Sequence, residues 1–174
     1  GPNEYENNVN NNFYTNYIAK WCIDYAHEQI LKVSLEYPSD HKRIIEKVKL
    51  SDAELQEWKK VSGNMYFPFS KEHGVYLQQD GFLDKHLVQV KDLDKSQRPI
   101  NQKWSWDRVL RSPYIKQADT LQGFYFFEDH FTREELEKHF DFYEPFTVHE
   151  SSLSPCVHSI QAAKLDKMDM AYTF

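Results

Sequence analysis

The chain opens with a run of asparagines, and this run limits more than any other feature what its first sixteen residues can form. Six of the ten residues from 7 to 16 are asparagine. Because the short amide side chain competes for backbone hydrogen bonds, asparagine is unfavourable inside helices but suits turns and helix caps. We therefore expect an irregular loop that ends where a helix begins.

An amphipathic helix is expected directly after this loop, from Thr15 onward. Apolar residues recur at steps of three to five: Ile18, Cys22, Tyr25, Ile30 and Val33. This spacing puts them on one face of a helix of about five turns, which ends before Pro38. Cys22 lies on that apolar face. It and Cys156 are therefore expected to be reduced thiols in the core of a cytoplasmic protein.

Capping signals predict several shorter helices. Asp40 is placed to cap one helix, and Ser51 with Glu54 forms a capping box for the next. Further along, helices are expected after Thr132 with Glu135, after Ser154 as N-cap with Pro155 at the first helical position, and from about Asp166. Thus the sequence predicts a mainly α chain.

Helical periodicity is lost between Gly63 and Gln102, where we expect a long excursion with two short strands. Loops of this length are often functional. The polar side chains in it have two readings, since they are able either to reach a ligand or only to tie the loop together. They are Glu72, Gln78, Gln79 and Asp80.

Three polar, aromatic-rich loops precede predicted helices, at residues 3–16, 104–119 and 143–155. Lys116 and Gln117 are expected on the first turn of a helix, where a lysine opposes the helix dipole. In an array of helical hairpins such loops gather at one end. Aromatic faces beside carboxylates and amides suit a sugar, but Glu4 and Glu6 also suit a solvated loop that complements a helix dipole.

Composition excludes some classes of partner. The chain has 27 acidic residues against 21 Lys plus Arg, and the basic residues are spread out, so nucleic acid is not an expected partner. No stretch approaches the roughly 18 apolar residues of a membrane span. The eight histidines show no close ligand spacing, so no metal is expected.

Five segments together resemble glycoside hydrolase family 65, the inverting disaccharide phosphorylases. They are Gly-Pro-Asn-Glu-Tyr with the asparagine run, Gln-Asp-Gly-Phe-Leu-Asp-Lys, Arg-Pro-Ile-Asn-Gln-Lys-Trp-Ser-Trp-Asp-Arg, Ser-Pro-Tyr-Ile-Lys-Gln-Ala-Asp, and Phe-Tyr-Glu-Pro-Phe-Thr-Val-His-Glu-Ser-Ser-Leu-Ser-Pro. The resemblance implies that residues 1–174 are a single region, the second half of an (α/α)6 barrel. The family's N-terminal β-sandwich and C-terminal β domain would lie outside it.

The resemblance also implies roles for particular residues. Glu4 falls on the family's general acid, and Lys116 with Gln117 falls on the pair that holds the transferred glucose. His149, Glu150, Ser151 and Ser152 are candidates for the phosphate vicinity, although serine and histidine at a helix start are often only caps. No cofactor is implied, because inorganic phosphate is a co-substrate and serves as the nucleophile.

The implied reaction converts maltose and phosphate to β-glucose 1-phosphate and glucose, since the resemblance is strongest to the maltose-cleaving subgroup. Alternative substrates within the family are trehalose, kojibiose, nigerose and trehalose 6-phosphate. Two other readings stay open: a non-catalytic fragment that self-associates through uncovered helix faces, and a sugar-binding module. A homo-oligomer is expected, because half a barrel leaves apolar helix faces uncovered.

Overall fold

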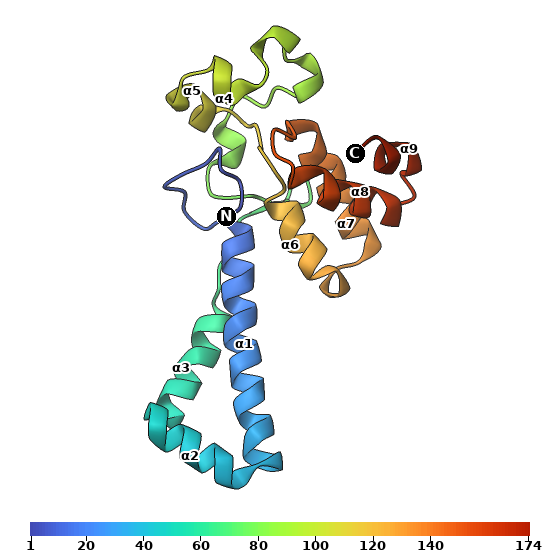
Figure 1. Ribbon diagram of the computed structural model, residues 1–174. Helices are drawn as coiled ribbons and strands as arrows, with labels where there is room; N and C mark the ends of the chain where they lie inside the picture. Colours follow the sequence, from blue (N-terminus) through green and yellow to red (C-terminus); the bar gives the residue numbers. More distant parts are fainter. The chain divides into compact units, whose positions relative to one another are not determined.

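The computed structural model describes all 174 residues, Gly1–Phe174 (Figure 1). They form two compact units: the larger consists of Gly1–Thr15 with Phe67–Phe174, and the smaller of Asn16–Tyr66. Helices make up 61% of the chain, which confirms the prediction of a mainly α fold. That these helices belong to one region of an (α/α)6 barrel stays a prediction.

The long helix expected after the asparagine run is α1 (Phe13–Glu36). It begins two residues earlier than predicted, because Asn12 acts as its cap. The Asn12 Oδ1 accepts a hydrogen bond from the Thr15 backbone N–H at 2.9 Å and from the Thr15 hydroxyl at 2.8 Å. The last amide of the run is thus used as a helix cap, as asparagine at this position predicts.

The smaller unit continues with α2 (Pro38–Val48) and α3 (Asp52–Gly63). The capping prediction for α2 is wrong: Tyr37 is the N-cap and Pro38 occupies the first turn, where its missing N–H costs nothing. Asp40 instead pairs with Arg43 on the helix surface. For α3 the prediction is confirmed, since the Ser51 side chain accepts from the Glu54 N–H.

Both cysteines are free and exposed, so the prediction of core thiols is wrong. The reason for Cys22 is that the smaller unit has almost no buried interior. Ser62 is its one buried residue, held between Lys20 and Asp24. Apolar periodicity therefore gave the correct helix but not a buried face.

The larger unit contains the two short strands that the sequence predicts in the excursion. β1 (Phe69–Ser70) and β2 (Val75–Tyr76) pair antiparallel around a turn in which Gly74 has φ of 66°. The other elements are α4 (Ile100–Lys103), α5 (Trp106–Arg111), α6 (Thr120–Phe126), α7 (Arg133–Tyr143), α8 (Ser154–Lys164) and α9 (Met168–Thr173), with short 3-10 turns between them. None of the helices combines the length and apolar character that a membrane span requires.

Of two helix starts predicted in this unit, one is confirmed and the other is one residue off. The capping box of α7 is confirmed: the Thr132 Oγ1 accepts from the Glu135 N–H, and the Glu135 carboxylate accepts from the Thr132 N–H at 2.8 Å. For α8 the prediction is one residue off, because Leu153 is the N-cap and Ser154 is the first helical residue. The buried Ser154 hydroxyl bonds His149 instead of capping the helix.

Two hydrophobic clusters form the interior of the larger unit. The first packs α6, α7 and α8 together and is centred on Phe82, Leu121, Phe140, Tyr143 and Val157. The second joins the opening loop to the middle of the chain and consists of Tyr5, Ile100, Val109, Tyr114 and Val148. Because Tyr5 is 1% exposed, the loop that carries Glu4 is anchored in the core at the next residue.

Candidate functional site

The three polar loops expected at one end of the helices meet in the larger unit. Ile115 and Thr147 form an isolated parallel bridge. The Ile115 N–H donates to the Phe146 carbonyl at 2.9 Å, and the Val148 N–H donates to the Ile115 carbonyl at 2.8 Å. This pairing joins the second loop to the third.

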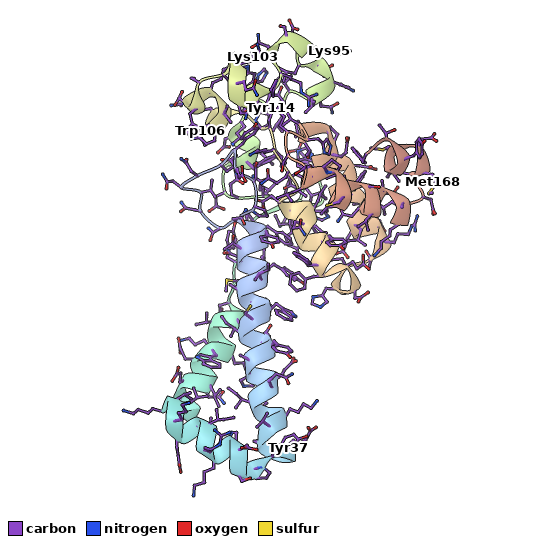
Figure 2. The ribbon with its side chains drawn as sticks, in the orientation of Figure 1. Tyr37, Lys95, Lys103, Trp106, Tyr114 and Met168 are labelled. Atoms are coloured by element: carbon purple, nitrogen blue, oxygen red, sulfur yellow. The ribbon has the colours of Figure 1, made fainter.

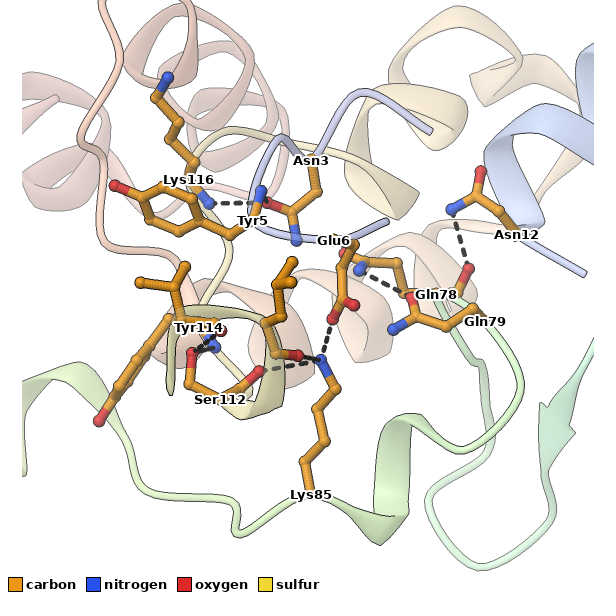
Figure 3. Close-up of polar contacts among 12 residues, drawn as sticks. Asn3, Tyr5, Glu6, Asn12, Gln78, Gln79, Lys85, Ser112, Tyr114 and Lys116 are labelled. Carbon is orange, nitrogen blue, oxygen red and sulfur yellow. Dashed lines mark hydrogen bonds and ion pairs between the residues drawn. The ribbon is translucent and has the colours of Figure 1, made fainter. Parts of the chain in front are cut away.

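The Asn3 side chain joins the opening loop to the second loop. Its Oδ1 accepts from the Lys116 backbone N–H at 3.0 Å and from the Tyr5 N–H at 3.1 Å (Figure 3). This one amide oxygen therefore holds two backbone segments together: that of Tyr5, which follows Glu4, and that of Lys116. Glu4 and Lys116 are brought together although 112 positions separate them.

Glu4 forms an ion pair with the Lys116 ammonium, and its side chain is 58% exposed. The hydrogen bond from Lys116, followed by its positive charge, holds the pKa of Glu4 below its usual range. A general acid must be protonated near neutral pH, whereas the shift in the pKa of Glu4 favours the carboxylate. A general acid at this position therefore needs Lys116 to be drawn away before it can act.

Lys116 and Gln117 do not lie on a helix, so that prediction is wrong. They lie in bends before α6, because residue 115 pairs with the third loop and Asp119 takes the N-cap position. The Gln117 Nε2 donates to the Pro2 carbonyl at 2.6 Å. Its Oε1 is buried without a hydrogen-bond partner, and such an acceptor is unusual in a native protein.

The other carboxylates near Glu4 hold separate parts of the chain together through ion pairs and hydrogen bonds. Glu6 pairs with Lys85, whose Nζ also donates to the carbonyls of Leu110 at 3.1 Å and Ser112 at 2.9 Å (Figure 3). The Glu6 side chain is 9% exposed. Neither Glu4 nor Glu6 lies in the first turn of α1, so their pairing with lysines replaces the helix-dipole reading.

Glu150 is a second carboxylate that holds parts of the chain together, and it contacts the opening loop through Tyr5. It accepts from the Tyr5 hydroxyl at 2.6 Å and from the Ile100 N–H at 2.8 Å. Burial and this carboxylate both raise the pKa of Tyr5. Trp106, labelled in Figure 2, places its ring edge-on to Tyr5 at 6.2 Å between centroids.

His149 is the best placed of the phosphate candidates. Its φ is 54°, its Nδ1 lies 2.8 Å from the Ser154 Oγ, and its Nε2 is buried without a partner. Burial lowers the pKa of His149 to about 4, so the ring is neutral near pH 7. It lines a cavity of about 620 Å³ with Lys91, Lys95 and Arg98.

The two serines of that group are placed differently. The Ser151 Oγ accepts from the Leu153 N–H at 3.2 Å, which is a local turn contact, and Ser152 is exposed. Ser151 therefore stabilises the turn before α8, whose N-cap is Leu153, and does not itself cap the helix. A role for either serine near phosphate stays a prediction.

The polar residues of the long excursion tie the chain together. Gln78 and Gln79 are fully buried and bond each other at 2.8 Å, and the Gln78 carbonyl accepts from the Phe13 N–H at 2.9 Å. Asp80 accepts from Asn11, while Glu72 is exposed. Of the two readings, the structural one therefore describes the glutamines.

Sequence reasoning missed the residues that hold this site together: Asn3, Lys85 and Asp119. Asn3 and Asp119 stand inside the motifs that carry the family resemblance, beside the residues given roles, so proximity to Glu4 and to Lys116 was the available signal. Lys85 ends a third motif. Its contacts with Glu6 and Ser112 span 79 and 27 residues, and no local pattern predicts such long-range pairs.

The fold and site define a mainly α domain in which polar loops bring one exposed carboxylate to a lysine and a glutamine, a set suited to binding a sugar. The glycosyl hydrolase family 65 central catalytic domain matches residues 1–174. The chain belongs to this family.

Several relatives show the same likeness. Maltose phosphorylase from Bacillus subtilis (strain 168) is 53% identical over 165 residues, 95% of this chain and 21% of the relative. Alpha,alpha-trehalose phosphorylase from Thermoanaerobacter brockii is 39% identical over the whole chain and 22% of the relative. A solved structure provisionally described as a kojibiose phosphorylase from human microbiome gives a TM-score of 0.87 at 35% identity, covering 99% of this chain and 24% of that one. The chain thus spans about a fifth of its curated relatives.

Proposed function

We propose that this chain supplies the general acid and the glucose-binding pair of an inverting disaccharide phosphorylase. Maltose is the proposed substrate, because the relative with 53% identity is named a maltose phosphorylase. Relatives named for trehalose, kojibiose and nigerose are also similar, so these disaccharides and trehalose 6-phosphate are the alternatives. The products from maltose are β-glucose 1-phosphate and glucose.

One observation carries the proposal: the Glu4 carboxylate is exposed, whereas the other carboxylates near it are held by contacts inside the protein. An inverting hydrolase needs a second carboxylate to activate water on the far side of the sugar. Here Glu6, Glu150 and Asp119 all accept hydrogen bonds within the protein. This arrangement supports phosphorolysis, in which phosphate is itself the nucleophile and needs no protein base.

The proposed reaction begins with proton transfer from the Glu4 carboxylic acid to the glycosidic oxygen. The bond between that oxygen and the anomeric carbon breaks, and a phosphate oxygen bonds to the anomeric carbon from the opposite face. Glucose leaves with the proton, and Glu4 remains as a carboxylate. The proton that phosphate loses on esterification passes through water to the Glu4 carboxylate, which restores the acid and balances the reaction.

Lys116 and Gln117 are proposed to hold the glucose unit that is transferred. The Gln117 Oε1 has no partner in the protein, which supports this role: once the side chain turns outward, a sugar hydroxyl would satisfy it. When the Lys116 ammonium turns to sugar hydroxyls, its ion pair with Glu4 is broken. The pKa of Glu4 then rises, because its main cause of lowering is gone and the bound sugar excludes water.

Phosphate is proposed to bind on the His149 side of the site. Lys91, Lys95 and Arg98 line the same cavity as His149, against one carboxylate, that of Glu144. The excess of positive charge suits an anion. The buried His149 Nε2 lacks a partner. Ser151 and Ser152 are retained in the proposal only as neighbours of His149 in the chain.

The role of Glu4 is tested in the complete enzyme with Glu4→Gln, using maltose and an activated substrate, α-glucosyl fluoride. With maltose the rate is expected to fall at least about a hundredfold. With the fluoride, whose leaving group needs little protonation, the loss is expected to be much smaller. Equal losses on both substrates would remove Glu4 from the role of acid, and an unchanged rate on maltose would do the same.

For the 174-residue chain taken alone we propose self-association without catalysis. The smaller unit exposes several large apolar side chains: Trp21, Tyr25, Leu31, Leu35 and Tyr37. Such surface favours association in water. Sedimentation equilibrium is expected to give a mass above 20.8 kDa, and a monomer at all concentrations would contradict this.

A further inference from the structure

Asp119 follows the glucose-binding pair by two residues, and it is 2% exposed. It occupies the N-cap position of α6 but makes no capping hydrogen bond with its side chain. Its two oxygens point instead to the opening loop: Oδ2 accepts from the Asn3 N–H and Oδ1 from the Asn12 Nδ2, each at 2.9 Å. Both oxygens of a buried carboxylate are thus used outside its own helix.

The two partners of Asp119 hold the two ends of the loop that carries Glu4. Asn3 precedes Glu4 and passes its side-chain oxygen to Tyr5 and Lys116. Asn12 caps α1 and also donates to the Gln78 carbonyl at 3.0 Å. A single side chain therefore fixes the start of the loop, its end, and the segment that carries Lys116.

Gly1 shows how closely the backbone approaches this carboxylate. A Cβ at position 1 would overlap Asp119 Oδ2 and lie within 2.6 Å of both amide atoms of Asn12. Real Cβ atoms essentially never come so near. A side chain at position 1 would therefore require the side chains of Asp119 and Asn12 to move.

We propose that Asp119 is a positioning residue that sets the place of Glu4 relative to Lys116. It does not touch the substrate and acts through Asn3 and Asn12. Its contribution to turnover rests on the proposed function, whereas its hold on the loop does not. Two groups of experiments separate these claims.

The first experiment exchanges donor and acceptor in the complete enzyme. Asp119→Asn replaces one acceptor by a donor, so either the Asn3 N–H or the Asn12 amide meets another donor. Misplacement on this scale is expected to lower kcat with maltose by about a hundredfold, with KM for phosphate little changed. Asp107→Asn, at an exposed pair with Arg111, is the control and leaves kcat unchanged.

The matched rescue is the double variant Asn12→Asp with Asp119→Asn. The new carboxylate at position 12 accepts from the new amide at position 119, and its other oxygen keeps the cap on α1 at Thr15. The Gln78 carbonyl loses its donor at position 12 and keeps only the Phe13 N–H, so the rescue is expected to be partial. At least about tenfold of the lost kcat is expected to return. A double variant that is no better than Asp119→Asn alone contradicts the assignment.

A third kinetic comparison tests whether Asp119 acts through Glu4. Adding Asp119→Asn to Glu4→Gln is expected to cost little more than Glu4→Gln alone, because groups acting as one unit are not additive. Independent, multiplying losses overturn the proposal. If the unmodified enzyme turns over none of the disaccharides, the proposed function has failed. The claim that Asp119 positions the loop is then decided by hydrogen exchange.

Hydrogen exchange in the 174-residue chain needs no turnover. The amides of Tyr5 and Lys116, both bonded to Asn3, are expected to exchange at least about tenfold faster in Asp119→Asn, with α7 unchanged. Rates at Tyr5 and Lys116 that stay the same overturn the proposal. Acceleration throughout α7 also overturns it, because it indicates a general loss of structure.

Discussion

Lys85 bonds both to the loop that carries Glu4 and to the segment before Lys116. The effect of its removal on the free energy of unfolding can be calculated. Its side chain is 14% exposed and that of its partner Glu6 9% exposed. Lys85→Met leaves a buried, uncompensated carboxylate and removes the donor to the carbonyls of Leu110 and Ser112. Breaking a buried pair from one side costs about 3 to 5 kcal/mol.

Urea unfolding measures this loss in the free energy of unfolding. With a slope of about 2 kcal/mol per molar urea, the midpoint is expected to fall by about 1.5 to 2.5 M. Trp104 lies in the larger unit, whereas Trp21 and Trp58 lie in the smaller one. A background with Trp21→Phe and Trp58→Phe therefore makes fluorescence report on the larger unit.

Two variants make the test specific. Lys103→Met removes an exposed lysine and is expected to shift the midpoint by less than about 0.3 M. Glu6→Gln combined with Lys85→Met removes the buried charge and is expected to recover about half of the loss. A shift for Lys85→Met no larger than that of Lys103→Met refutes the reasoning, because it means that the pair is not buried in solution.

Three further predictions concern single residues. Lys116→Met removes the cause that lowers the pKa of Glu4, so this pKa is expected to rise in a carboxyl NMR titration, and an unchanged value would contradict the ion pair. The His139 Nε2 accepts from the Tyr76 N–H at 2.7 Å, and burial lowers the pKa of His139 from 6.5 to about 4. Because the unfolded chain then binds a proton that the folded chain does not, stability is expected to fall as pH drops from 6.5 to 4, by about 3 kcal/mol from this group. Urea unfolding at several pH values checks this. His139→Phe should reduce the dependence by that share, while the buried His149 and His158, whose pKa values are also lowered, keep the rest. Thr132→Ala breaks the capping box of α7 and is expected to cost about 1 kcal/mol, again by urea unfolding, with no loss meaning that the cap is frayed.

Local signals predicted the helices well, since each rests on neighbours in the sequence. Apolar steps and the caps at Ser51 and Thr132 located α1, α3 and α7. The errors at Asp40 and Ser154 are shifts at helix starts, where a proline within the first turn decided the boundary. At these two helix starts the preference for a polar N-cap competes with the preference for proline in the first turn, and the sequence alone does not show which one prevails.

Long-range pairing explains what local reasoning missed at the site. Lys116 was expected on a helix because apolar spacing after it is helical, but Ile115 is bridged to Thr147 and the helix begins only at Thr120. Asp119 carried no local signal of its role, because its oxygens accept from Asn3 and Asn12, more than a hundred residues away. Tertiary contacts of this kind override local preference.

The most direct test of the central claim is the configuration of the first product. The complete enzyme is incubated with maltose and inorganic phosphate, and the anomeric proton of the product is followed by NMR from the earliest time. Glu4 acting as acid against attack by phosphate from the opposite face predicts β-glucose 1-phosphate and an equal amount of glucose. Formation of α-glucose 1-phosphate, or of glucose alone at a rate independent of phosphate, would contradict the account.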